Sequence, residues 1–120
     1  MIEKTNILKL EKKPVNQIHG EKVLYQIIWG NTRGNKTCLK RITAVAQMSI
    51  PPGETNLVHN HKDDEQIYLI LKGGGTVQIG DERTETEEGD VIFLPVNVPH
   101  AFFNTTADET VILNVSCRVT

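Results

Sequence analysis

Short apolar runs separated by Gly, Pro and Asn-Asp clusters dominate the hydropathy pattern of the chain. The runs are rich in Val, Ile, Thr and aromatic residues, and they show almost none of the 3.6-residue periodicity of an amphipathic helix. Runs of this kind predict β-strands. We expect strands at residues 23–29, 41–50, 57–61, 66–72, 76–79, 91–94, 100–104 and 111–118.

The second run shows the clearest alternation, because its apolar side chains recur at every other position up to the break at Pro51-Pro52-Gly53. Residues two apart on a strand share one face, so we expect one face of this strand to carry Ile42, Ala44, Ala46, Met48 and Ile50. About eight to ten short strands without helices between them indicate an all-β sandwich or closed barrel. We expect one barrel domain over residues 21–120, preceded by an arm at residues 1–20 whose "NILKL" segment could add to a sheet edge.

The charge balance narrows the classes of partner. Lys and Arg total 13, Asp and Glu total 15, and no basic block occurs, which argues against nucleic acid or an anionic membrane surface. The start of the chain is too charged for a signal peptide, and no apolar run has spanning length, so we expect a cytoplasmic protein. Cys38 and Cys117 form no CxxC motif, and we expect two reduced, partly buried thiols.

The segment "HNHKDDEQ" at residues 59–66 is the first candidate for chemistry. Residues two apart on a strand lie roughly 6.5 Å apart on the same side, so His59 and His61 can turn toward one metal ion. The His-x-His pattern is a weak signal by itself, and a polar loop of solvated histidines is the alternative. Either Glu65 or Gln66 would supply a further ligand.

Two longer spacings make this segment more specific. Gly53 lies six residues before His59, Gly73 follows the Glu-Gln pair, and "GDVIFLPVNVPHAFFN" occupies residues 89–104. The two stretches resemble the signatures of the cupin superfamily, G-x5-H-x-H-x3–4-E-x6-G and G-x5-P-x-G-x2-H-x3-N. The resemblance implies a cupin double-stranded β-helix, a jelly-roll-like barrel. It also implies that His59, His61 and His100 bind a metal together with one member of the Glu-Gln pair.

The chain departs from these signatures at two positions. Counting back six residues from Gly73 reaches Gln66 rather than Glu65, so we predict Gln66 as the ligand and keep Glu65 as the alternative. If Gln66 faces inward, strand alternation turns Tyr68 and Ile70 inward as well. Asn97 stands where the family usually has glycine, and asparagine is among the few residues that tolerate a positive φ.

A neutral amide ligand leaves a divalent site near a charge of +2, whereas a carboxylate would lower it to about +1. The more positive site favours an anionic small-molecule ligand and disfavours a ferric state. The donors suit Zn, Ni, Fe, Mn or Co. We expect Lewis-acid chemistry of the isomerase or lyase type on a polar, carboxylated or sugar-like molecule. The alternatives are a metal-dependent dioxygenase and a non-catalytic ligand-binding module.

Further side chains are expected around the ligand. Tyr68 is the candidate for proton transfer, with simple packing as its alternative. The pocket is expected to be lined by Phe93, Phe102, Ile70 and Met48. The alternatives are that Phe93 faces the opposite side of its sheet and that Phe102 fills the core. Leu69 and its apolar neighbours two residues away would point outward from the same strand, and a strand that is apolar on both faces is covered on both. The cover would be the N-terminal arm, packing on the barrel or on a partner subunit, or a second subunit itself, and we expect a homodimer.

Overall fold

The computed structural model describes residues 2–14, 22–30 and 38–119, without the side chains of Val58 and His59. In these ranges the chain forms nine strands and a three-residue 3-10 helix, and no described helix is long and apolar enough to cross a bilayer. The elements are η1 (Ile7–Lys9), β1 (Leu24–Trp29), β2 (Ile42–Ile50), β3 (Thr55–His59), β4 (Asp64–Lys72), β5 (Gly75–Ile79), β6 (Glu82–Thr86), β7 (Val91–Leu94), β8 (His100–Phe103) and β9 (Thr110–Arg118).

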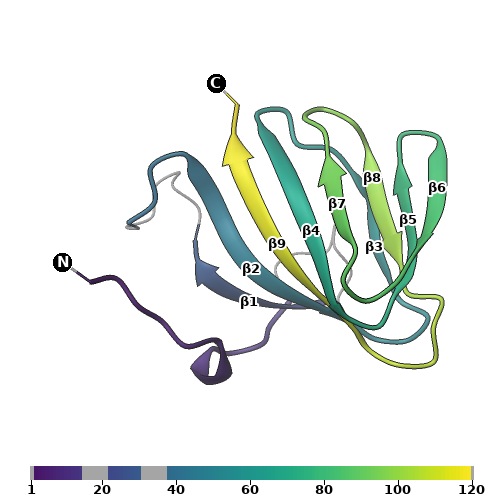
Figure 1. Ribbon diagram of the computed structural model, residues 1–120, viewed down its shortest axis with the longest axis horizontal. Coiled ribbons are helices and arrows are strands. Elements are labelled where there is room, and N and C mark those ends of the chain that lie inside the picture. Colours follow the sequence, from purple (N-terminus) through teal and green to yellow (C-terminus); the bar gives the residue numbers. More distant parts are fainter. Residues whose placement is uncertain (1, 15–21, 31–37, 120) are drawn as a thin grey trace.

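Two antiparallel sheets face each other (Figure 1). One has five strands in the order β1-β2-β9-β4-β7, and the other has four in the order β3-β8-β5-β6. The last strand, β9, lies between β2 and β4 and pairs with both over most of its length. Strands distant in sequence are thus neighbours in space, as in a jelly roll, and the predicted all-β barrel class is confirmed.

All eight expected strands are present within a few residues of their predicted ends, and one strand was missed. β6 has the polar sequence ERTET and four of its five residues are exposed. Its pairing with β5 over five residue pairs holds it in the sheet. A strand kept in place by backbone hydrogen bonds at a solvated edge carries no hydrophobic alternation, so the sequence pattern does not reveal it.

The core lies between the two sheets, and its largest members are at most 1% exposed. The interior-facing side chains of both sheets contribute, namely Met48, Ile50, Ile70, Leu94, Phe102 and Ile112. Met48, Ile70 and Phe102 were expected to line the ligand pocket, and the structure places them in this packed core. Phe102 would be buried at this position in either role, as a wall of the pocket or as a filler of the core.

The apolar face expected on β2 is interrupted at the first residue of the strand. A register irregularity lies between Ile42 and Ala44 where β2 pairs with β9. Thr43 is consequently buried at 3% exposure and Ile42 is 38% exposed. The expectation that Ile42 shares a face with Ala46, Met48 and Ile50 is therefore wrong, because a bulge shifts the alternation by one residue.

Asn104, the last residue of the second signature stretch, joins the end of β2 to the loop between β8 and β9. It is 2% exposed, and its Nδ2 donates to the carbonyl oxygens of Ile50 at 2.8 Å and Asp108 at 2.9 Å. Its Oδ1 accepts from the backbone N–H and the hydroxyl of Thr106. A buried amide with all these partners is a structural residue.

The N-terminal arm contacts β1 through backbone groups. Gln26 Nε2 donates to the carbonyl oxygens of Ile7 at 2.8 Å and Leu10 at 3.0 Å, and Lys13 forms an isolated bridge with Tyr25. The "NILKL" segment forms η1 rather than a strand, so edge pairing occurs only at Lys13 among the described residues of the arm. The rest of the predicted arm, residues 15–20, lies outside the described residues.

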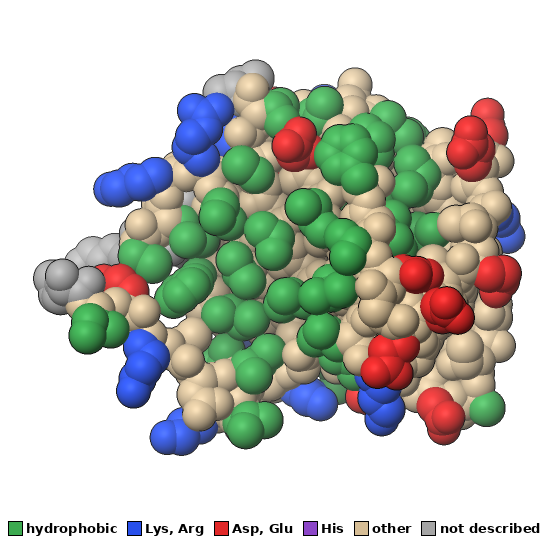
Figure 2. All heavy atoms as spheres, in the orientation of Figure 1, with side chains coloured by type: hydrophobic (Ala, Val, Ile, Leu, Met, Phe, Trp, Pro, Cys, Tyr) green, Lys and Arg blue, Asp and Glu red, His purple; other side chains and the backbone are tan. Residues whose placement is uncertain are grey.

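The outer face of the five-stranded sheet is apolar. One cross-strand row pairs Trp29 with Val45, Val45 with Val115, Val115 with Ile67, and Ile67 with Phe93. Figure 2 shows hydrophobic side chains gathered on this face over β2, β9, β4 and β7. The exposed fractions reach 46% for Ile67 and 57% for Phe93, and this row with its apolar neighbours is called the outer apolar face below.

The two cysteines are free. Cys117 is half-buried on β9, as expected. Cys38 is exposed, so the expectation of partial burial is wrong for this residue. It precedes β2 in the chain and lies outside the paired strands, so the sheet does not cover it.

Gly75 is required by a close backbone approach. Its φ is +147°, and a Cβ at this position would lie 2.3 Å from the Phe103 carbonyl oxygen. We expect Gly75→Ala to lower the free energy of unfolding by about 3 kcal/mol or more, since it combines backbone strain with a steric clash. Gly53→Ala is the control, because Gly53 has φ +77° and open space around it, and should cost about 1 kcal/mol. Equal losses in chemical denaturation would contradict this explanation.

Candidate metal centre

β4 presents Gln66 to the barrel interior. Gln66, Tyr68 and Ile70 are 6%, 3% and 1% exposed, whereas Ile67 and Leu71 are 46% and 41% exposed. This alternation is the one expected for Gln66 pointing inward. Glu65 is half-buried on the opposite side of the strand, where it pairs with Cys117. Of the two candidate ligands, only Gln66 lies on the interior face.

The carboxamide of Gln66 has a defined orientation. Its Nε2 donates to Ser116 Oγ at 2.8 Å and to Asn114 Oδ1 at 3.2 Å, and both acceptors lie on β9. Its Oε1 is buried and has no hydrogen-bond partner among the described residues. A buried carbonyl oxygen without a partner costs free energy unless a further group satisfies it, so this oxygen fits the place of a ligand to a cation.

His100 begins β8 and is 2% exposed. Its ring lies 5.6 Å from the His61 ring and 6.1 Å from the Tyr68 ring, measured between centroids. Its Nδ1 is 3.4 Å from the carbonyl oxygen of Val98. The structure therefore brings together His61, His100 and Tyr68, and Tyr68 shares the interior face of β4 with Gln66.

His61 reaches this position from a loop. β3 ends at His59, so the expectation of a strand continuing through His61 is wrong. The backbone N–H of Asn97 donates to the His61 carbonyl at 2.7 Å, and Asn60 Nδ2 donates to Asn97 Oδ1 at 2.7 Å. These bonds attach the segment to the turn before β8. Asn97 has φ 60°, which confirms the positive φ expected at this position.

His59 is described only through its backbone. The register of β3 pairs it with His100, after an irregularity between Asn56 and His59. Its side chain lies outside the described part of the chain. Within that part, no three His, Cys, Asp or Glu side chains form a group that could hold a metal. The predicted ligand set contains Gln66, which is none of these four residue types, and His59, whose side chain is not described. The four-ligand site therefore stays a prediction.

Phe93 does not line the interior. It is 57% exposed on β7, next to the buried Leu94. Leu94 pairs with the inward-facing Gln66 and Phe93 pairs with the outward-facing Ile67. The pairing of β7 with β4 thus fixes which face each residue takes, and the expectation that Phe93 lines the pocket is wrong.

A cavity of about 320 Å³ opens beside the histidines. It is lined by Asn60, His61, Lys62, Asp63 and Asp64. Asp64 begins β4 two residues before Gln66, and its Oδ2 accepts from Thr43 Oγ1 at 3.0 Å. The cavity therefore carries acidic and basic side chains together with His61, the predicted ligand that lines it.

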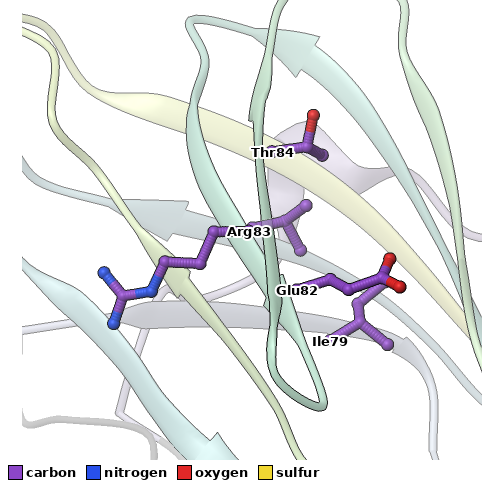
Figure 3. Close-up of a pocket in the computed structure, with 5 residues that line it drawn as sticks. Ile79, Glu82, Arg83 and Thr84 are labelled. Atoms are coloured by element: carbon purple, nitrogen blue, oxygen red, sulfur yellow. The ribbon is translucent and has the colours of Figure 1, made fainter.

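A smaller hollow of about 80 Å³ lies at the β5–β6 hairpin, lined by Val77, Ile79, Glu82, Arg83 and Thr84. Figure 3 shows Arg83 pointing to the opposite side of the strand from Glu82 and Thr84. The Arg83 guanidinium lies 4.7 Å from the Phe103 ring centroid, and its Nε donates to Gln78. None of the predicted site residues lines this hollow.

The two tyrosines of the chain are both buried. Burial raises the pKa of the Tyr68 phenol well above its usual value, and the nearby Tyr25 adds to the rise. Burial likewise raises the pKa of Tyr25, against a lowering by the hydrogen bond from Asn56. Tyr68 therefore stays protonated near neutral pH, which suits it as a hydrogen-bond donor and not as a base.

Residues 46–116 match the family model of the cupin domain. The matched segment runs from β2 into β9, covers more than half of the 120 residues, and contains all the predicted metal ligands. The chain belongs to the cupin family. As a cupin, it combines the expected double-stranded β-helix with the family's two signature stretches, both of which lie inside the match.

This cupin is similar to two curated proteins over about half of its length. It is 36% identical over 61 residues to an uncharacterized protein of Methanocaldococcus jannaschii, across 51% of this chain and 49% of that protein. It is 33% identical over 60 residues to the oxalate-binding protein of Thermotoga maritima, across 50% of each. The chain spans about half the length of these two relatives. A solved structure of a predicted oxalate decarboxylase from Thermotoga maritima has a TM-score of 0.81 at 20% identity, covering 98% of this chain and 100% of that one, which shows the shared fold.

The interior polar residues of β9 were missed by the sequence prediction. Ile112, Asn114 and Ser116 alternate along the predicted strand, and the two polar members contact Gln66. Polar residues in phase with a buried apolar residue were the available signal. Asn56 was missed in the same way; it is 1% exposed and donates to Tyr25 and to Met48 Sδ.

The raised pKa values of Tyr25 and Tyr68 predict a loss of stability in alkaline solution. The unfolded phenols release protons near pH 10 (about the reference value), while the folded protein retains them. The free energy of unfolding should be unaffected by these groups below about pH 10 and fall as the pH rises above it. Phenolate absorbance should appear together with unfolding, and Tyr68→Phe should reduce the slope of stability against pH by one proton. Ionisation of both phenols near pH 10 with the fold intact would contradict this.

Proposed function

We propose that this cupin binds a divalent transition metal and a small carboxylated ligand, and performs Lewis-acid chemistry of the isomerase or lyase type. The observation that carries the proposal is the buried Gln66 Oε1, which has no hydrogen-bond partner among the described residues and lies on the same interior face as Tyr68. His61 and His100 lie close to each other, and His100 lies close to Tyr68. Reduced thiols at Cys38 and Cys117 would fit a cytoplasmic location.

The residues present suit Zn, Ni, Fe, Mn or Co. Imidazole nitrogens and an amide oxygen are borderline N/O donors, and no cysteine belongs to the predicted set. His59, His61, His100 and Gln66 would hold the ion. When bound, such an ion polarises carbonyl or carboxylate oxygens of a ligand. The contribution of Tyr68 would be a hydrogen bond donated to that ligand, because its phenol keeps its proton.

The charge of the interior supports an anionic ligand. None of the buried residues that the structure describes is Lys or Arg, so the positive charge for an anion would come from the metal. A neutral Gln66 leaves that charge near +2, whereas a carboxylate would lower it to about +1. The oxalate-binding protein of Thermotoga maritima, 33% identical over 60 residues, supports a small carboxylate as the ligand.

Oxalate serves as the probe in a direct test. We expect calorimetry to show oxalate binding to Co(II)-loaded protein and not to the metal-free form. Gln66→Glu should still bind Co(II), but its affinity for oxalate should fall by about tenfold because the site loses one positive charge. The control is Glu65→Gln, which changes the charge by one unit on the opposite face of β4. Tighter oxalate binding to Gln66→Glu than to the unaltered protein would contradict the charge argument.

A non-catalytic binding module is the second candidate. The high pKa of Tyr68 removes it as a base at neutral pH, and a relative is described as oxalate-binding. Full recovery of unchanged ligand after prolonged incubation with metal-loaded protein would favour binding over catalysis.

We further propose that the outer apolar face is covered by a second copy of the chain. The described part of the arm lies at the β1 end of the sheet, where it buries Gln26 to 5% exposure. Ile67, Val91 and Phe93 at the β4–β7 end remain 46%, 66% and 57% exposed. An apolar patch that crosses five strands is larger than the scattered apolar residues typical of a monomer, and a twofold dimer would pair it with itself.

The dimer can be tested by charge substitution. We expect a dimer in sedimentation at micromolar concentration, and we expect Ile67→Lys to shift it to the monomer because a buried unpaired ammonium is costly. Leu57→Lys is the matched control, since Leu57 is 47% exposed on β3 of the other sheet. A monomeric unaltered protein, or equal dissociation by both variants, would contradict the proposal.

A further inference from the structure

Two oxygen atoms on β9 hold the nitrogen end of the Gln66 side chain. Ser116 lies directly opposite Gln66 in the β4–β9 register, and Asn114 is the next residue on the same face, opposite Tyr68. The Gln66 Nε2 hydrogens point at Ser116 Oγ and Asn114 Oδ1, at 2.8 and 3.2 Å. Both hydrogens of the amide are thereby used on the β9 side, and the oxygen is left on the other side.

We propose that Ser116 and Asn114 are positioning residues, which select the end of the Gln66 amide that faces the metal centre. This inference rests on the proposed function, because it concerns the orientation of a predicted metal ligand. An amide oxygen has lone pairs to donate to a cation, whereas the NH2 group has hydrogens directed outward and no available lone pair. A Gln66 amide turned by half a rotation would present the wrong group.

Glutamate at the same position would not need this selection. The two oxygens of a carboxylate are equivalent, so either one can face the centre whichever way the group turns. A neutral ligand therefore depends on its neighbours in a way that a charged one does not. Ser116 and Asn114 thus make glutamine a usable ligand here. The neutral glutamine in turn leaves the centre with a higher positive charge than glutamate would.

This dependence is tested by comparing Co(II) affinities in two backgrounds, one with the native Gln66 and one with Gln66→Glu. Co(II) is titrated into metal-free protein, and its visible absorption gives both the affinity and a spectroscopic signature. We expect Ser116→Ala and Asn114→Leu each to weaken Co(II) binding by roughly 10–100-fold, the usual effect of losing an outer partner of a ligand. In the Gln66→Glu background the same two changes should alter the affinity less than about threefold. The difference between backgrounds is the coupling that a double-mutant cycle isolates.

Ser116→Thr is the conservative variant, because it keeps the hydroxyl on a strand, and it should restore the affinity to within about threefold of the unaltered protein. This variant also serves if Ser116→Ala or Asn114→Leu fails to fold. Equal losses with the native Gln66 and in the Gln66→Glu background would show a merely structural role and overturn the inference. Unchanged affinity of the β9 variants with the native Gln66 would overturn it as well.

Failure of the proposed function would look different. His100→Ala removes a predicted ligand without touching the Gln66 amide. If the unaltered protein binds Co(II) no more tightly than His100→Ala, the metal site itself is wrong and the inference fails with it. If His100→Ala loses Co(II) while the β9 variants do not, the metal site stands and only the role of Ser116 and Asn114 is refuted.

Discussion

The position of β9 between β2 and β4 is the constraint on which the rest of the structure depends. This strand pairs with β2 on one side and β4 on the other, so the end of the chain completes the middle of the larger sheet. Its inward residues pass from apolar to polar along its length, from the buried Ile112 to Asn114 and Ser116. One strand thus supplies both part of the core and the support of the predicted metal site, and stability and site geometry are coupled through it.

The polar part of the interior of this cupin is nearly uncharged. Asn56, Gln66, Ser116 and two protonated phenols lie inside or near the core, and the described buried residues include no carboxylate. Such a set can orient a ligand through hydrogen bonds, while the charge that attracts it would come from a metal. Carboxylates and a lysine lie instead at the cavity that His61 lines, as Asp63, Asp64 and Lys62.

Local pattern was enough to predict most strands and the inward face of β4. The spacing from Gly73 and strict alternation place Gln66 inside, and the structure agrees. Alternation within one strand failed where pairing with a neighbouring strand decides which face a residue takes. A bulge in the pairing with β9 turns Ile42 outward, and pairing with β4 turns Phe93 outward. β7 has only four residues, which is too short for its own pattern to decide which face is buried.

Non-local hydrogen bonds account for the remaining misses. His61 leaves the strand because Asn97, 36 positions later in the chain, holds its carbonyl, and Ser116 meets Gln66 across 50 residues. A single sequence does not reveal which strands will be neighbours, so it does not reveal these partners. Asn97 was predicted correctly for its backbone angle, and its second role in attaching the His61 segment became visible only with the turn in place.

The polar edge strand β6 has a consequence for how copies of the protein meet. A free strand edge is a template for uncontrolled chain-to-chain pairing, and natural sheets blunt it with charged side chains. β6 places Glu82, Arg83 and Glu85 along such an edge, four of its five residues being exposed. Another chain that paired with this edge would have to desolvate three charged side chains. Fibril-like growth through this edge of the smaller sheet is thereby discouraged.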